Sequence, residues 1–89
     1  MWAYATTGHA APLLFDEVAR EARPRLHDFK TQELSNTVWA YATAAHHADD
    51  FLEALAAESA SRIQFFNPQE LANTAWAFAT LGNEKRMRR

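Results

Sequence analysis

The stretch Gln69-Glu70-Leu71-Ala72-Asn73-Thr74-Ala75-Trp76-Ala77-Phe78-Ala79-Thr80 decides the fold, because most of it occurs again elsewhere in the same chain. Its first half returns, nearly unchanged, at residues 32–37 and its second half at residues 39–43, both 37 positions earlier. The second half stands once more at residues 2–6, a further 37 positions back. Four other pairs share the offset: Phe29 with Phe66, Arg25 with Arg62, Glu21 with Glu58, and Val18 with Leu55. Self-similarity at one fixed period is the signature of a repeat architecture.

The repeated stretch is predicted to form the first helix of each unit. Asn67 stands at an N-cap, Pro68 at the first helical position, and Glu70 where a capping box requires an acid. Gly82 is expected to end this helix as a C-cap. In the earlier copy, apolar residues follow at steps of four, three and four, which places them on one helical face. They are Leu34, Val38, Tyr41 and Ala45.

A second helix is expected to start near Pro12 in one unit and at Asp49-Asp50 in the next, where the two acids suit a helix N-terminus. Its apolar stripe is Phe15, Val18, Ala22 and Leu26, repeated as Leu52, Leu55, Ser59 and Ile63. Neither helix can bury its apolar face alone, and stacking of helical hairpins solves this. The sequence therefore predicts an all-α fold, an α-solenoid of stacked hairpins with a 37-residue repeat.

The repeat also divides the chain. A helical array is expected over residues 1–82, as units 2–38 and 39–75 and a partial unit 76–82, followed by a basic tail at residues 83–89. That is 89/37, or about 2.4 units, whereas helical arrays usually need about three. We therefore expect the chain to be a piece of a longer array.

Composition limits the possible functions. The chain has no Cys, which excludes thiolate catalysis and Cys-type zinc sites, and no run of 18 apolar residues that would span a membrane. Residues 1–82 carry a net charge of −5 and residues 83–89 one of +3, so the body is not a general binder of polyanions. Met1 leads directly into a repeat motif, so no presequence is expected.

No catalytic constellation stands out, because the chain has no Ser/His/Asp arrangement, no Gly-rich phosphate loop and no paired carboxylates to nominate. The cluster of His46, His47, Asp49 and Asp50 contains residue types that bind metals, but only His46 has a counterpart in the repeat (His9), and no His-Glu-x-x-His spacing exists. We expect no enzyme, no metal, no cofactor and no small-molecule substrate.

A polar line recurs on the predicted first helix. Asn36 and Thr43 lie on one side of it, and Asn73 and Thr80 repeat them 37 residues later. An Asn amide presents a donor and an acceptor together, so these side chains are candidates for pairing with base edges. The alternative, favoured on general grounds, is that the two Asn residues tie down a neighbouring loop carbonyl in each unit.

Two further groups have alternative roles. Trp39 and Trp76 could stack on unpaired bases, but an Ala-rich helix pair needs a large side chain between its helices, so packing is favoured for both. The basic tail could bind phosphate, or it could be a solvated end or the start of a further helix. Its cations are Lys85, Arg86, Arg88 and Arg89.

The stretch from Phe66 to Gly82, with its earlier copy at residues 29–45, resembles repeats of algal and protist proteins. Those repeats are related to the octotricopeptide and heptatricopeptide repeats, the FAST-kinase-like leucine-rich proteins, and the repeats of the RNA-editing substrate-binding complex. The resemblance implies RNA binding in mitochondria or chloroplasts, acting on the processing, stability or translation of organellar transcripts. It implies that the first helices face the RNA, with Asn36, Thr43, Asn73 and Thr80 as the corresponding positions.

The sequence thus favours a non-catalytic RNA-binding array with single-stranded RNA along its concave face. The alternative is a protein–protein interaction scaffold of the same architecture, in which the Asn side chains hold the extended backbone of a partner. Charge favours the scaffold, and the family resemblance favours RNA.

Overall fold

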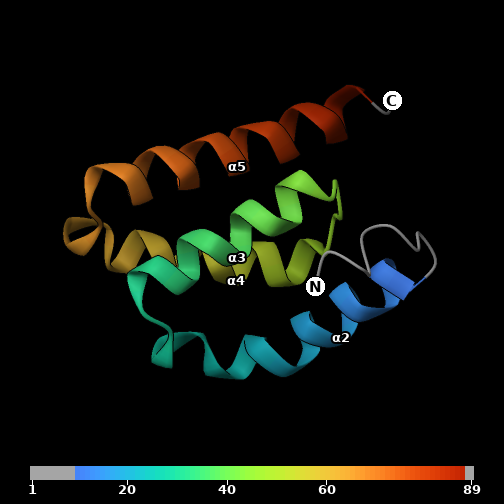
Figure 1. Ribbon diagram of the computed structural model, residues 1–89, viewed down its shortest axis with the longest axis horizontal. Coiled ribbons are helices and arrows are strands. Elements are labelled where there is room, and N and C mark those ends of the chain that lie inside the picture. Colours follow the sequence, from blue (N-terminus) through green and yellow to red (C-terminus); the bar gives the residue numbers. More distant parts are fainter. Residues whose placement is uncertain (1–9, 88–89) are drawn as a thin grey trace.

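The computed structural model describes residues 10–87, which form helices joined by short turns and loops (Figure 1). In chain order these are α2 (Ala10–Ala22), the 3-10 helix η1 (Arg23–Asp28), α3 (Thr31–Thr43), α4 (Asp49–Ser61), the 3-10 helix η2 (Ile63–Phe65) and α5 (Pro68–Met87). No strand occurs within this part of the chain, so the prediction of an all-α fold is confirmed. The motif copy at residues 2–6 lies outside the described residues.

The helices run in two opposite directions. In Figure 1, α3 and α5 run side by side in one direction, while α2 and α4 run the other way. The boundaries follow the sequence offset: α3 begins at Thr31 and α5 at Pro68, and η1 and η2 end at Asp28 and Phe65, each pair 37 residues apart. The predicted start of α4 at Asp49 is confirmed.

Tyr41 lies at the centre of the core. Its ring centroid is 4.7 Å from that of Phe15 on α2 and 5.2 Å from that of Phe51 on α4, so one side chain of α3 contacts both neighbouring helices. Leu34 and Val38 are fully buried and Tyr41 is 2 % exposed, which confirms three members of the predicted face of α3. Aromatic pairs at such separations add about 0.5–1.5 kcal/mol beyond their buried area.

The N-termini of α3 and α5 are capped by local side chains. Asn67 Oδ1 accepts from the Glu70 backbone N–H at 2.7 Å, and Glu70 Oε1 accepts from the Asn67 N–H at 3.0 Å, which confirms the predicted capping box. At α3, Glu33 Oε1 accepts from the Lys30 N–H at 2.8 Å, but the Lys30 ammonium has no acceptor with which to reciprocate. The later copy is therefore the better capped of the two.

The ends of α3 and α5 differ. After α3, Ala45 takes a left-handed conformation (φ 55°), and His46 N–H bonds the Tyr41 carbonyl at 3.0 Å, as in a Schellman motif. Ala45 was expected to extend the apolar face of the helix and instead follows its end. Gly82, 37 residues later, was expected to end α5, and this is wrong because the helix continues to Met87. The residues after Gly82 are mostly strong helix formers, so the helical hydrogen bonding continues through it.

The predicted stripe of the second helix is only partly buried. Ala22 and Leu26 are buried on the α2–η1 segment, as are Leu52, Leu55 and Ser59 on α4. Val18 and Ile63 are 39 % and 47 % exposed and do not belong to the core. Among residues 10–87, no helix is both long enough and apolar enough to cross a membrane.

Candidate functional site

A polar groove lies between the N-terminal halves of α3 and α5. Its volume is about 180 Å³, and most of the residues that line it carry a side-chain amide. They are Gln32, Ser35, Asn36, Asn67, Gln69, Glu70 and Asn73. Because α3 and α5 start at equivalent residues and run side by side, equivalent amides from the two helices line one groove. We call these seven residues the amide groove.

Buried side chains, most of them small, pack between α3 and α5 and set the distance between the two helices. On α5, Thr74, Ala77 and Leu81 are buried, and the main neighbour of α5 is α3. Ser35 is 1 % exposed, and its hydroxyl donates to the Glu70 carbonyl oxygen at 3.3 Å. Ala77 has no exposed surface, so the seam at this point is closed by a methyl group and leaves no space for a larger side chain.

Asn36 and Asn73, two of the predicted site residues, come together in the amide groove. Asn36 is exposed and Asn73 is half-buried, and within residues 10–87 neither side-chain amide forms a hydrogen bond with the protein. Within the described residues, neither Asn side chain therefore ties down a loop carbonyl. Each amide keeps a donor and an acceptor available to a ligand.

The remaining predicted site residues do not line the groove. Thr43 and Thr80 follow Asn36 and Asn73 by seven residues, which is two helical turns along the same side, and they are exposed and half-buried respectively. Of the basic residues, Lys85 and Arg86 belong to the last turns of α5, where only the backbone is described. The predicted contacts of Arg88 and Arg89 lie outside the described residues.

Both described tryptophans are exposed, so the expectation that they fill the gap between helices is wrong. Trp39 is 46 % and Trp76 is 50 % exposed, and small residues close the seam in their place. Trp39 follows Ser35 by one helical turn, so it lies on the same side of α3, next along from the amide groove. The sequence did hold a signal: Trp39 follows the buried Val38 by one residue and so points about 100° away from the core face.

The groove has little charge. Glu70 is the one ionisable residue that lines it, and one of its carboxylate oxygens already accepts from the Asn67 backbone N–H. No Lys or Arg lines this groove. A site of amides with few charges suits uncharged polar groups, such as base edges or peptide groups. Any attraction for phosphate has to come from elsewhere on the chain.

The His46 side chain contacts Asp16 and the core residue Tyr41 and does not line the amide groove. Its Nε2–H donates to Asp16 Oδ1 at 2.7 Å, and its ring packs edge-on against Tyr41 at a centroid distance of 5.8 Å. Over the described residues, no group of three or more His, Asp or Glu side chains gathers around a position suited to a metal.

Five amides line the groove, and the sequence analysis selected two of them. It missed Gln32, Gln69 and Asn67, although Gln32 and Gln69 share a repeat column and could have been found by it.

Comparison of the chain with protein-family models, with curated proteins and with solved structures gave no match.

Proposed function

We propose that this chain is a non-catalytic RNA-binding segment of an α-solenoid with a 37-residue repeat, and that single-stranded RNA lies along the face formed by α3 and α5. The observation that carries the proposal is the amide groove, in which Asn36 and Asn73 have no hydrogen-bond partner in the described part of the protein. In a longer array, one such groove per unit would suit a polymer with a regular spacing of bases.

The proposed recognition uses two kinds of contact. The exposed indole of Trp39 offers a stacking surface beside the groove, and stacking of one base on an aromatic side chain contributes about 1–3 kcal/mol. The amides of Asn36 and Asn73 pair with the edge of the stacked base, since each carries both a donor and an acceptor. Thr43 and Thr80 offer hydroxyls two turns further along the same side.

Phosphate contacts are assigned to the end of the chain. Lys85, Arg86, Arg88 and Arg89 give this segment its positive charge, whereas residues 1–82 are acidic. If all four cations neutralise phosphates of a single strand, a plot of the logarithm of the binding constant against the logarithm of the salt concentration has a slope of about −3. A rise from 50 to 200 mM salt would then weaken binding by about 50-fold.

The cellular setting rests on the family resemblance alone. Repeats of this kind imply a role in the processing, stability or translation of transcripts in mitochondria or chloroplasts. The partner proposed is therefore an organellar transcript with an unpaired segment.

The test is a fluorescence-anisotropy titration of a mixed-sequence single-stranded RNA with the whole chain at the two salt concentrations. Binding that weakens steeply with salt supports the RNA proposal. A folded chain that binds no RNA at 50 mM salt contradicts it, and removes the organellar assignment as well.

A second candidate, a protein–protein interaction scaffold, is favoured by one observation: no Lys or Arg lines the amide groove. Peptide groups, like base edges, present a donor and an acceptor to such a site, and they need no cation. Capture of a protein partner that is insensitive to salt, by a chain that binds no RNA, would favour this candidate.

A further inference from the structure

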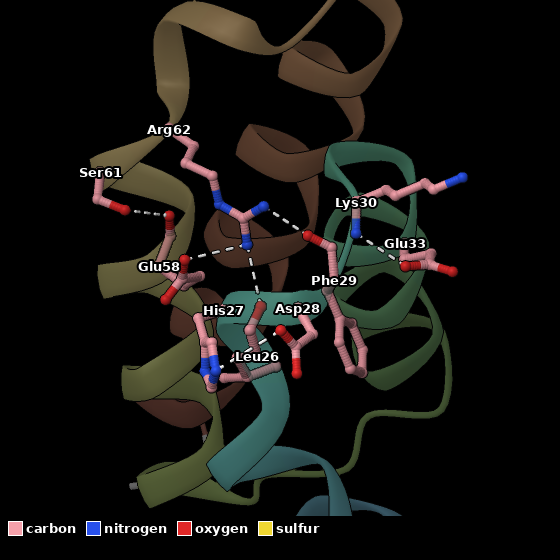
Figure 2. Close-up of polar contacts among 9 residues, drawn as sticks. All are labelled: Leu26, His27, Asp28, Phe29, Lys30, Glu33, Glu58, Ser61 and Arg62. Atoms are coloured by element: carbon pink, nitrogen blue, oxygen red, sulfur yellow. Dashed lines mark hydrogen bonds and ion pairs between the residues drawn. The ribbon is translucent and has the colours of Figure 1, made fainter.

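Arg62, at the end of α4, ties that helix to the preceding η1 segment (Figure 2). Its guanidinium donates to the Leu26 carbonyl oxygen at 3.0 Å and to the Phe29 carbonyl oxygen, and it pairs with Glu58 Oε2 at 3.0 Å. The side chains of Arg62 and Glu58 are 23 % and 25 % exposed. One side chain thus satisfies carbonyls at the end of a segment that lies about one repeat earlier in the chain.

The same pair of residues stands one repeat earlier without such partners. Arg25 and Glu21 are the 37-residue counterparts of Arg62 and Glu58, and they pair at 3.6 Å with side chains 68 % and 63 % exposed. Within the described residues, Arg25 has no contact with a backbone carbonyl comparable to those of Arg62. Arg25 therefore lacks the partner that its counterpart has.

An open apolar groove of about 270 Å³ lies beside Arg25. Its lining is Leu14, Glu17, Val18, Glu21, Ala22, Arg25 and Phe29. The apolar members have counterparts one repeat later that are all buried, with exposures of 2 %, 0 %, 4 % and 6 %. Those counterparts are Phe51, Leu55, Ser59 and Phe66. Val18, by contrast, is 39 % exposed although Ala22 is buried, so the surface that is covered at Leu55 in the later repeat is open at Val18 in the earlier one. We call the seven lining residues the Arg25 face.

In the later repeat, the corresponding surface of α4 is covered by η1. The segment η1 packs on α4, and its Leu26 is 4 % exposed there. The counterpart of η1 is η2, in which Ile63, the counterpart of Leu26, is 47 % exposed and Phe65 is 66 % exposed. We call Ile63, Phe65 and the carbonyls of Ile63 and Phe66 the Ile63 face. The chain therefore presents the two halves of one known interface at two separate places.

We propose that the chain binds a second copy of itself head to tail, with the Arg25 face of one copy on the Ile63 face of another. Arg25 then donates to the carbonyls of Ile63 and Phe66, as Arg62 does within the chain to those of Leu26 and Phe29. Val18 and Ile63 are buried together in the contact. The two faces differ from one another, so each added copy leaves one of each face free, and the assembly grows without closing at a dimer.

The test is sedimentation velocity of the whole chain from 5 to 500 µM, without RNA. The expected result is a sedimentation coefficient that rises with concentration and does not level off at the value of a dimer. Val18→Glu and Arg25→Glu each place a carboxylate in the contact and are expected to keep the chain monomeric. Arg23→Glu, at an exposed cation that does not line the groove, is the matched control and is expected to assemble as the unchanged chain does.

A mixture of two variants identifies the geometry. Val18→Glu leaves the Ile63 face intact, and Ile63→Glu leaves the Arg25 face intact. Each variant alone is expected to be monomeric, while an equal mixture is expected to form a dimer that grows no further. Because Val18, Arg25 and Ile63 are exposed in the single chain, these changes leave its core in place, which circular dichroism verifies.

Three outcomes would overturn the proposal. They are a chain that stays monomeric at 500 µM, a dimer that adds no further copies, and assembly that persists in both Val18→Glu and Arg25→Glu. A monomer would leave another part of the same chain, or a different protein, as the partner of the Arg25 face. None of these results depends on RNA binding, so the proposed function stands or fails separately.

Discussion

The Tyr41 hydroxyl donates a 2.6 Å hydrogen bond to the backbone carbonyl oxygen of Phe15 and so joins α3 to α2. Tyr41 is 2 % exposed, and burial, with a smaller contribution from the Asp16 carboxylate, raises its pKa to about 12. The ordinary value of 10.0 describes the unfolded chain. The fold therefore holds this proton more tightly than the unfolded state does.

This difference predicts a loss of stability at high pH. The contribution of Tyr41 is complete below pH 10 and is lost as pH rises towards 12, because the unfolded chain releases the proton first. The loss amounts to roughly 2–3 kcal/mol in the free energy of unfolding. Urea denaturation at pH 8, 10 and 11.5 measures it, and Tyr41→Phe is the control that lacks the titrating hydroxyl. Parallel curves for the two chains would show that Tyr41 titrates normally.

Arg62→Ala is expected to destabilise the chain by about 2–3 kcal/mol, because it leaves the Phe29 carbonyl and the Glu58 carboxylate without their partner. It also removes the second hydrogen bond to the Leu26 carbonyl, which keeps that from the Phe29 N–H. Arg25→Ala, at the exposed counterpart, is expected to change stability by less than about 0.5 kcal/mol. Thermal unfolding at low micromolar concentration, below self-association, compares the two. Equal effects at both positions would contradict the assignment of Arg62 as a link between helices.

Asn67→Ala removes a capping side chain and is expected to cost about 1 kcal/mol. Asn36→Ala and Asn73→Ala remove amides that bond nothing in the described protein, so each is expected to cost less than about 0.5 kcal/mol. Urea denaturation of the three variants checks this. A cost of 2 kcal/mol or more for the Asn36 and Asn73 changes would mean that these amides are structural.

Ala45 and Gly82 occupy the same repeat column, and opposite substitutions are expected to stabilise them. Ala45 has a φ of 55°, where Gly has no steric cost, so Ala45→Gly is expected to gain about 0.5–1 kcal/mol. Gly82 lies inside α5 with open space around its Cα, so Gly82→Ala is expected to gain a similar amount. Melting temperatures that fall in both variants would contradict the two backbone assignments.

Local signals in the sequence predicted the helices well. The Asn67–Glu70 cap, the start of α4 at Asp49 and the buried face of Leu34, Val38 and Tyr41 depend on residues close together in the chain. The burial of the second helix was harder to predict, because it depends on a neighbour. Val18 and Leu55 share a column, yet only Leu55 has another segment of the described chain packed over it.

The candidate site was predicted only in part, again because some of its features depend on a neighbouring helix. The recurrence of Asn36 and Asn73 marked one side of the helices, and this side does line the groove. The exposure of Trp39 and Trp76 depends on how closely α3 and α5 approach, and this is set by small residues such as Ala77. The Ala-rich composition suggested that a large side chain was needed between the two helices, but small residues fill this space.

The proposed use of the amide groove is tested most directly by RNA anisotropy with a double variant, Asn36→Ala with Asn73→Ala, at 50 mM salt. Asn83→Ala, at an exposed amide of α5 that does not line the groove, is the matched control. The folded double variant is expected to bind single-stranded RNA about tenfold or more weakly than the unchanged chain, while the control is expected to bind as the unchanged chain does. Equal RNA affinity in all three chains would contradict it.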